Sequence, residues 1–550
     1  MVSRLRAFLP VLLLTAACIG TPAGGRGGQT ASPEPAVSGR QARTYLERLA
    51  CGLPRSELLR VWRGYYPGRS GEIQLMTKEP HVIGNWYPHS GPWDYLQRVP
   101  MLWYGPGHVP AVGAVSRPAT MADVAPTIAQ WLDFDFKAPD GRPMSEALLP
   151  PGQRNELPKL VVVMVWDAGG RNVMAEYPEA WPVLRRLIPR GAWFERFTVG
   201  SSPSITPAIH ATLGTGAFPR RHGVVDARLR LGKELARPEY TWPGVVKAPT
   251  LAELYDRHAG NVPRIGVVAS HTWHLTMIGT GSHFHGGDKD LAILKESKRW
   301  GLGEALRRFY ETRTYPNRVP GLDAAIRRMD IADGQLDGVW LGEDFRAKPR
   351  MLPRTPAYSE WQTSILREVI RREGFGADEV PDLLFTNYKQ IDLVSHAESM
   401  NSPQMESVLR ASDEALGDLV RILNRDVGRG EWVLALTADH GATPRPSESG
   451  AVFMLPNELA EDIRTGFDDG SGRDVIQAIR PTEMWVDVGE LRANGFTLND
   501  LARFLSRYTR KQLAKQPADL SEEQRNEHMF SLVIPGPMLD RLPCLASDAP

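Results

Sequence analysis

Cysteine is nearly absent from this sequence of 550 residues, which contains three. That number excludes a disulfide-rich scaffold and a zinc module built on cysteine, so any metal must be held by histidine and carboxylate side chains. Charge of one sign is also lacking, because 65 lysine and arginine residues stand against 64 aspartate and glutamate residues. A net charge of +1 gives no overall basic field, and we expect no binding to nucleic acid.

Long hydrophobic runs are missing except at the N-terminus, which excludes a polytopic membrane protein. Residues 1–18 combine Arg4 and Arg6 with a short apolar stretch, the pattern of a secretory signal. Cys18 follows Thr-Ala-Ala, which resembles a bacterial lipoprotein cleavage box, although Thr15 stands where leucine is usual. We therefore expect an exported protein, either a cell-surface lipoprotein acylated at Cys18 or a secreted or periplasmic one. Membrane contact is expected only through that lipid, and an uncleaved anchor is the remaining alternative.

The rest of the chain divides into a tether and one large domain. Residues 19–43 are rich in glycine, proline, serine and alanine, which predicts a flexible tether. Beyond them, short apolar runs typical of buried parallel strands alternate with helical patterns such as residues 406–424. The runs cover residues 72–77, 99–105, 160–167, 264–269, 382–388 and 432–441. This alternation predicts an α/β fold, a three-layer sandwich with helices on both faces of a mostly parallel central sheet.

Residues from about 280 to 380 break the alternation and are rich in arginine, glycine, proline and tryptophan. We interpret them as an insertion that caps the site. The glycine-rich and histidine-rich stretch at 279–288 lacks the preceding strand of a dinucleotide-binding fingerprint. We interpret it as a loop beside the cap rather than a nucleotide loop or a third metal site, with substrate contact as the alternative.

Three predicted strands end in side chains that can bind a metal: Asp167 after the first, Asp392 and His396 after the second, and Asp439 and His440 after the third. One aspartate after a strand commonly forms only a turn, but parallel strands bring three such ends to one edge of the sheet. Asp392 and His396 are four residues apart, which places both on one face of a helical turn. Carboxylate and imidazole are ligands that zinc accepts.

A fourth segment, residues 202–216, is rich in serine, threonine and glycine and opens a predicted helix. The N–H groups at a helix N-terminus attract anions. A hydroxyl in this position is a candidate metal ligand and nucleophile, because zinc lowers its pKa.

Together these motifs resemble the alkaline phosphatase superfamily, close to the type I phosphodiesterase/nucleotide pyrophosphatases and the bacterial zinc phosphatases. Thr206 precedes His210 by four residues in a segment that closes on T-L-G-T-G, and P-x-x-H-G follows at 219–223. The strand ends match D-x-x-x-H and D-H-G, and the resemblance covers residues 159–445. It implies an alkaline-phosphatase-like fold, a two-metal phosphoric ester hydrolase and a phosphothreonine intermediate on Thr206.

The resemblance also implies two divalent metal ions, in the first place Zn²⁺, and their ligands. One ion takes Asp167, Thr206, Asp439 and His440, and the other takes Asp392, His396 and one further histidine. His210 and His222 are implied to be structural.

In the family the last zinc histidine follows D-H-G, where this chain has only His528 in an unlike segment. The matching sequence P-H-S-G-P-W-D-Y lies instead at residues 88–95, near the N-terminus. We infer a circular permutation, which is tolerated when the old termini are neighbours. His89 is then the last zinc ligand, and His528 is the reserve candidate.

The permutation sets the expected domain organisation. Residues 44–150 are expected to correspond to the C-terminal part of the family's fold, and residues 159–550 to form the main catalytic part. Residues 44–550 together would make one domain. The new termini would be neighbours, so Cys51 and Cys544 are expected to form a disulfide, with two unrelated thiols as the alternative.

The substrate class stays open between phosphodiesters and phosphate monoesters. Monoesterases of the family add a lysine and an arginine, and the corresponding residues 265–274 contain neither. This favours a phosphodiesterase or nucleotide pyrophosphatase acting on a small phosphate ester or nucleotide, with His271 and His274 as candidate substrate contacts. Ile209 stands where the diesterases carry a phosphate-binding asparagine, so that contact is absent or comes from elsewhere.

Two further alternatives remain. Ile205 occupies the place of the arginine in the sulfatase motif, which disfavours a sulfatase. A non-catalytic surface protein that retains the fold is the rival from another class, and its signature would be the loss of a metal ligand.

Overall fold

The computed structural model describes residues 39–545 except for residues 85, 154–155, 238–243, 297–298, 469, 471–473 and 514–519. The expected signal with Cys18 and most of the expected tether therefore lie outside the described residues. Helix α1 (Gly39–Cys51) includes residues 39–43, which the composition predicts as the end of the flexible tether. Of the helices that the structure describes, none has the length and apolarity to span a bilayer.

The largest sheet of the described chain has nine strands, in the order β13-β12-β11-β16-β6-β17-β3-β7-β4. The five neighbours from β12 to β17 are parallel. They are β12 (Leu291–Glu296), β11 (Ile265–Ala269), β16 (Asp382–Tyr388), β6 (Leu160–Trp166) and β17 (Trp432–Thr437). The outer strands are β13 (Arg299–Gly301), β3 (Met101–Tyr104), β7 (Ala192–Phe194) and β4 (Gly113–Val115). Every residue of β6, β16 and β17 is buried, as expected for strands covered on both faces.

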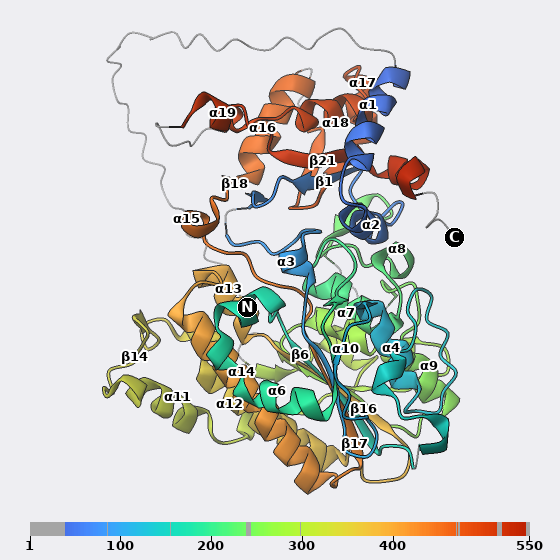
Figure 1. The fold of residues 1–550 in the computed structure, drawn as a ribbon, viewed down its shortest axis with the longest axis vertical. Helices are drawn as coiled ribbons and strands as arrows, with labels where there is room; N and C mark the ends of the chain where they lie inside the picture. Colours follow the sequence, from blue (N-terminus) through green and yellow to red (C-terminus); the bar gives the residue numbers. More distant parts are fainter. Residues whose placement is uncertain are drawn as a thin grey trace, which may run out of the picture.

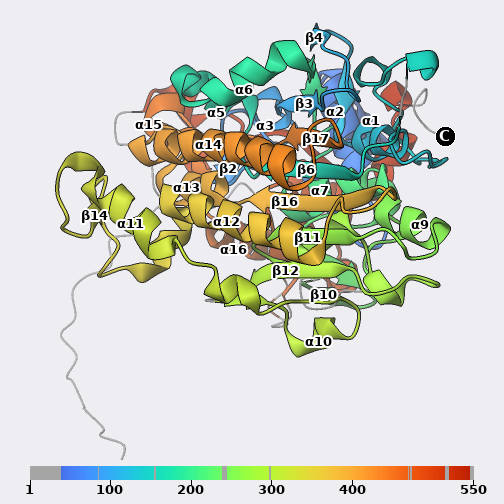
Figure 2. The same cartoon turned by 90° about the horizontal axis from the view of Figure 1, so that it is seen from below.

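Helices cover both faces of this sheet, which confirms the predicted three-layer α/β sandwich (Figure 1). One face carries α6 (Pro182–Leu187), α12 (Pro356–Glu373) and α14 (Pro403–Asp426), and the other carries α4 (Val124–Ala129), α7 (Thr206–Thr215) and α9 (Leu251–His258). The long helices α12 and α14 lie side by side in Figure 2. Helix α14 contains the helical pattern predicted at 406–424.

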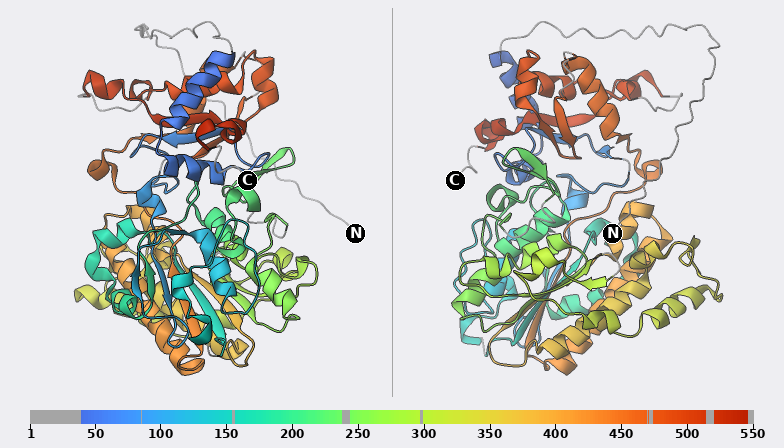
Figure 3. Two further views of the ribbon diagram at one scale, coloured as in Figure 1. Left: turned by 45° about the vertical axis from the view of Figure 1, so that its right-hand side comes forward. Right: turned by 180° about the vertical axis from the view of Figure 1, so that it is seen from behind.

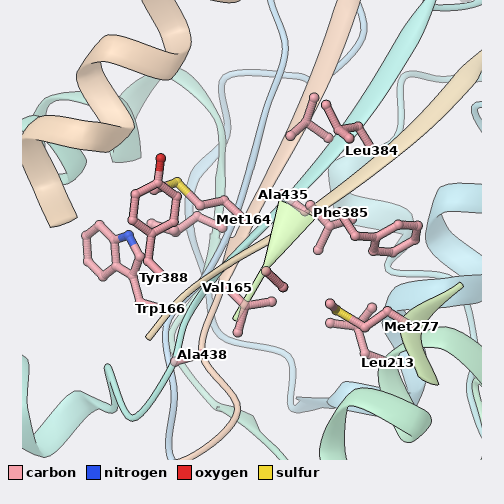
Figure 4. Close-up of a cluster of buried hydrophobic side chains, with 14 of the residues drawn as sticks. Met164, Val165, Trp166, Leu213, Met277, Leu384, Phe385, Tyr388, Ala435 and Ala438 are labelled. Atoms are coloured by element: carbon pink, nitrogen blue, oxygen red, sulfur yellow. The ribbon is translucent and has the colours of Figure 1, made fainter. Parts of the chain in front are cut away.

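Alternate side chains of the central strands supply the two cores. In Figure 4, Met164, Trp166 and Tyr388 point to one side of the sheet, and Phe385 points to the other, towards Leu213 and Met277. All of these side chains are buried, with at most 2% of their surface exposed. The strands are thereby fixed from both faces, which holds the loops at their ends in place.

A smaller lobe stands at one end of the larger body, next to α3 (Asp94–Gln97) and α13 (Gln390–Glu398) (Figures 1 and 3). Its antiparallel sheet has the order β19-β20-β1-β21 and its own apolar core. The strands are β19 (Ile476–Ile479), β20 (Glu483–Val486), β1 (Ile73–Thr77) and β21 (Phe530–Pro535). Helices α1, α16 (Pro456–Phe467) and α18 (Leu498–Ser506) pack on it. The lobe thus combines the beginning and the end of the described chain.

Short elements complete the described fold. The helices are α2 (Arg55–Gly64), α5 (Arg171–Glu176), α8 (Pro219–His222), α10 (Glu304–Arg307), α11 (Leu322–Asp330), α15 (Pro446–Ser449), α17 (Val488–Ala493) and α19 (Glu522–Arg525). The strands are β2 (Val82–Ile83), β5 (Ala119–Thr120), β8 (Phe197–Thr198), β9 (Leu229–Leu231), β10 (Glu234–Ala236), β14 (Val339–Trp340), β15 (Glu343–Asp344) and β18 (Phe453–Met454).

Three placements differ from the sequence-based expectations. The run at 72–77 forms β1 of the smaller sheet, and the run at 99–105 forms β3, which is antiparallel to β17. The segment 280–380, expected as a cap, adds β12 and β13 to the central sheet and α12 to its flank. A buried apolar run does not reveal the direction or the sheet of a strand, since both kinds of strand are covered on both faces here.

Cys51, at the end of α1, and Cys544 form a disulfide across 493 positions of sequence. It joins the first described helix to the last described segment, beside Leu58, Trp62 and Leu542.

Replacing both cysteines by serine should lower the free energy of unfolding by about 2–4 kcal/mol, because the open chain gains conformational freedom. Thermal and denaturant unfolding of the purified double variant measure the loss. A reducing agent should destabilise the wild type to a similar degree and leave the double variant unchanged. Equal stability of the oxidised wild type and the variant would contradict the prediction.

Candidate metal centre

The candidate centre lies at the carboxyl ends of three adjacent strands. Because β6 runs between β16 and β17, the residues that follow these strands meet at one edge of the sheet. Asp167 directly follows β6, and its N–H donates to the carbonyl of Tyr388 at 3.0 Å. Asp439 and His440 follow β17, and α13 follows β16 with Asp392 and His396 on it.

His89 reaches the same place from the N-terminal part of the chain. Its Nε2 lies 3.4 Å from Asp392 Oδ1, and Nε2 of His396 lies 3.5 Å from that oxygen. The rings of His89 and His440 are stacked, with centroids 3.6 Å apart and planes 4° from parallel. The structure therefore brings His89 together with residues more than three hundred positions away.

Thr206 is the first residue of α7, where unpaired N–H groups and the helix dipole favour an anion. Its Oγ1 lies 3.5 Å from Asp167 Oδ1, and 4% of its surface is exposed. Ser204 Oγ donates to the carbonyl of His89 at 2.8 Å, which ties the segment before α7 to the segment that carries His89.

The proposed ligand atoms form two groups. One carboxylate oxygen or ring nitrogen of His89, Asp392 and His396 lies within 4.8 Å of the other two, and the same holds for Asp167, Asp439 and His440. The groups adjoin, because His440 Nε2 lies 3.5 Å from Asp167 Oδ1 and 3.9 Å from Asp392 Oδ1.

Backbone carbonyls fix the tautomer of all three histidines. The Nδ1 atoms of His89, His396 and His440 lie 3.1, 3.1 and 3.0 Å from the carbonyl oxygens of Ser204, Tyr87 and Gly441. A carbonyl only accepts, so each Nδ1 carries the proton and each Nε2 turns a lone pair to the centre. Proteins orient metal-binding imidazoles in this way.

The donor set fits metal ions. Asp392 Oδ1, Asp439 Oδ2 and His440 Nε2 are buried without a hydrogen-bond partner. Zinc bonds of about 2.1 Å in a tetrahedral shell place neighbouring ligand atoms roughly 3.4 Å apart. The separations of 3.4 and 3.5 Å around Asp392 and His440 have that size.

Electrostatics keeps these ligands in the form that binds a metal. Burial lowers the pKa of His396 to about 4 and lowers the pKa of His440 well below its usual value, so both rings are neutral. Burial opposes ionisation of Asp392, but the ammonium group of Lys389 outweighs it and holds the pKa of Asp392 well below the usual value. Burial and the neighbouring Asp439 raise the pKa of Asp167.

Lys389 is a site residue that the sequence analysis missed. Its Nζ lies 2.8 Å from Asp167 Oδ2 and 2.9 Å from Asp392 Oδ2, and it donates to Thr206 Oγ1 at 3.1 Å. Burial works against its charge, but Asp167, Asp392 and Asp439 together raise its pKa. The signal in the sequence was a lysine directly after the strand 382–388 and three residues before Asp392.

Two hydrogen bonds orient the carboxylates of Asp167 and Asp439. Asn387 Nδ2 donates to Asp167 Oδ2 at 2.9 Å, and the N–H of Ala168 donates to Asp439 Oδ1 at 3.1 Å. Ala168 has φ +62°, a left-handed conformation that costs about 1 kcal/mol in an alanine. The turn after β6 is thus held so that its N–H orients Asp439.

The other expected histidines take different places. His210 lies behind the centre, with Nε2 3.8 Å from Asp439 Oδ2 and Nδ1 3.1 Å from Nδ1 of His274. Both rings have no exposed surface, so His274 backs the centre rather than facing solvent. His271 is partly exposed and lies against Trp273.

His222 and His528 lie outside every group of candidate metal ligands found among the described residues. His222 bonds to Thr212 Oγ1 and accepts from the N–H of Val224, both at 3.1 Å, and burial lowers its pKa to about 3. His528 is in the smaller lobe, where Nδ1 lies 3.0 Å from the carbonyl of Ser506.

The chain is similar to a known protein family and to several known proteins. The sequence profile of the family described as type I phosphodiesterase/nucleotide pyrophosphatase matches residues 161–529. Alkaline phosphatase PafA of Elizabethkingia meningoseptica is 26% identical over 207 residues, which are 37% of this chain and 37% of that protein. This chain thus spans little more than a third of that relative. A protein of Myroides odoratus named calcium-transporting ATPase is 25% identical over 402 residues, 65% of this chain and 69% of its own length.

Among solved structures, wild-type alkaline phosphatase PafA is similar to this chain with a TM-score of 0.48 and 16% sequence identity. The similarity covers 68% of this chain and 85% of the PafA chain.

Replacing Lys389 by methionine leaves Asp167 and Asp392 facing each other without a cation. The metal-free variant should lose about 3–5 kcal/mol of unfolding free energy at about pH 8, the usual cost of removing one partner of a buried ion pair. The loss should shrink as the pH falls to about 5. A carboxylate with a raised folded-state pKa destabilises the fold above that pKa and stops doing so once protonated.

Thermal unfolding of chelator-treated protein over this pH range checks the prediction. Lys348→Met is the matched control, because Lys348 is half exposed and pairs with Glu343 at the surface. A loss of stability that does not vary with pH would contradict the explanation.

Proposed function

Since residues 161–529 match the family profile, the chain belongs to the type I phosphodiesterase/nucleotide pyrophosphatase family, and we propose that it is a metal-dependent hydrolase of phosphate esters. The observation that supports this most is the convergence of buried, unpartnered ligand atoms from three strand ends beside the hydroxyl of Thr206. The proposed substrates are small molecules with phosphodiester or pyrophosphate bonds, nucleotides among them.

Two divalent ions, zinc in the first place, are proposed to occupy the two groups. Asp167, Thr206, Asp439 and His440 would hold one ion, and His89, Asp392 and His396 the other. When bound, such ions withdraw charge from phosphoryl oxygens and lower the pKa of a nearby hydroxyl.

The residues of the chain supply the rest of the proposed mechanism. Thr206 Oγ1 gives up its proton to solvent and attacks phosphorus, so that a bond from Oγ1 to phosphorus forms while the bond to the leaving oxygen breaks, and the leaving oxygen takes up a proton from water. Lys389 holds Oγ1 through its hydrogen bond and favours the deprotonated oxygen. The N-terminus of α7 presents N–H groups to the anionic phosphoryl group. Water then attacks the phosphothreonine, releases the product and restores the hydroxyl.

We also propose that the chain is a circular permutant of its family. Two observations support this. Strand β3, from the N-terminal part of the chain, pairs directly with β17, and the segment before β3 contains His89, which lies next to Asp392. The disulfide between Cys51 and Cys544 supports export, because disulfides persist in oxidising compartments. Acylation of Cys18 would then be the only membrane contact.

A phosphate monoesterase with the same site is the second candidate, and Lys389 is the observation that favours it. The absence of lysine and arginine from residues 265–274 favours diesters. However, the buried ammonium group of Lys389, which follows β16, donates a hydrogen bond to Thr206 Oγ1. An ammonium beside the nucleophile can neutralise the extra charge of a monoester. Residues 265–274 alone therefore do not exclude a monoester substrate.

Thr206→Ala should reduce hydrolysis of bis-p-nitrophenyl phosphate and p-nitrophenyl phosphate by about 10³-fold or more, because no other group replaces the nucleophile. Metal content should remain largely unchanged, since the other ligands stay. Thr206→Ser, which keeps the hydroxyl, is the control and should retain part of the activity. Undiminished turnover by the alanine variant would show that Thr206 is not the nucleophile. The ratio of kcat/KM for the two substrates in the wild type decides between the two candidates.

His89→Ala should lose the ion proposed at Asp392 and His396, because one of three protein ligands is removed. Metal analysis after dialysis should show about one ion fewer per chain than in the wild type. His528→Ala is the matched control and should keep the metal content of the wild type, since its ring lies in the smaller lobe. The opposite pattern would identify His528 as the ligand and reject the permutation.

A further inference from the structure

A second acidic cluster lies away from the candidate metal centre. Asp256 belongs to the last turn of α9, and Asp288 and Asp290 belong to the segment that leads into β12. One carboxylate oxygen of each lies within 4.8 Å of the other two. The cluster adjoins the start of β12, whereas the candidate centre follows the ends of strands parallel to β12, so the two sites occupy opposite edges of the sheet.

Two of the three carboxylates are buried. Asp256 and Asp290 have 3% and 6% of their surface exposed, and Asp288 is exposed. Asp256 Oδ1 is buried without a hydrogen-bond partner. The carboxyl groups of Asp256 and Asp288 are close enough to share a hydrogen bond, and no described residue outside the cluster forms an ion pair with any of the three. A buried carboxylate in a native protein ordinarily has such a partner, so something else must compensate this charge.

The neighbouring polar groups are engaged elsewhere. Glu253 accepts from the N–H groups of Thr250 and Thr280 at 2.8 and 2.6 Å. Lys289, between the two aspartates, directs Nζ to the carbonyl of Arg307 at 2.9 Å. Of the described residues near the cluster, none supplies a cation to it.

The close approach of the three carboxylates raises the pKa values of the two buried ones. Burial and the charge of Asp288 raise the pKa of Asp256 to about 7, and burial with Asp256 and Asp288 raises that of Asp290 well above its usual value. Such a cluster is relieved either by a proton or by a cation.

We propose that Asp256, Asp288 and Asp290 bind a calcium ion, with water completing the shell on the exposed side at Asp288. An all-oxygen set of carboxylates suits a hard cation, and the set contains no nitrogen or sulfur ligand that would favour zinc. Three carboxylates that come this close together can share one calcium ion, whose bonds to oxygen are about 2.4 Å long. Magnesium requires a tighter and more regular octahedron.

The ion would fasten α9 to the loop that enters β12. That loop follows the turn Thr272–Met277 in the chain, so calcium would stabilise this side of the larger body without taking part in the chemistry. This inference does not depend on the proposed hydrolase activity.

The test uses the full-length protein after dialysis against calcium-free buffer. Calcium at about 5 mM, above the Kd of roughly 10⁻⁴–10⁻³ M of weak extracellular calcium modules, should raise the wild-type Tm by about 1–2 °C. Asp256→Asn/Asp290→Asn should show a higher Tm than the calcium-free wild type, because the repulsion is gone, and no response to calcium. Equilibrium dialysis with radioactive calcium should show about one ion fewer per chain in this variant.

Two controls separate this site from others. Asp135→Asn, at an exposed aspartate, and Asp392→Asn, in the candidate centre, should both keep the calcium response. The proposal is overturned if calcium leaves the wild-type Tm unchanged, if the double variant responds as the wild type does, or if magnesium raises the Tm as much as calcium.

Discussion

Uncompensated negative charge at the carboxyl edge of the central sheet is the constraint on which the site depends. Asp167, Asp392 and Asp439 are buried there, and Lys389 is the one ammonium that reaches them among the described residues. Three carboxylates against one ammonium leave negative charge that the low dielectric of the interior makes costly. Cations relieve that cost, and the unpartnered oxygens of Asp392 and Asp439 mark where they would bind.

The rest of the site follows from holding these groups in place. Strands β16, β6 and β17 are buried on both faces and set the positions of the residues that follow them. Backbone carbonyls fix each imidazole through Nδ1. The positions of the three imidazoles therefore depend on the main chain, whereas the side chains of Asn387 and Lys389 help to hold the carboxylates.

Sequence reasoning succeeded where one strong physical signal fixed the outcome. Continuous apolar runs located β6, β16 and β17, and polar residues at their ends located Asp167, Asp392 and Asp439. It failed where packing alone decides: the direction of β3, the sheet of β1 and the place of segment 280–380 depend on long-range pairing. Lys389 was missed because a lysine after a strand ordinarily extends into solvent, and only the three-dimensional arrangement shows carboxylates on both sides of it.

The route by which His89 reaches the centre has a mechanical consequence. Its segment leaves the smaller lobe at β2, passes Asp392, and enters the larger body at α3, so one of the stretches of chain that connect the two parts carries a ligand. A rotation of the smaller lobe away from the body would pull that imidazole from its partners. Metal binding by His89 would therefore also restrain the smaller lobe against the larger body.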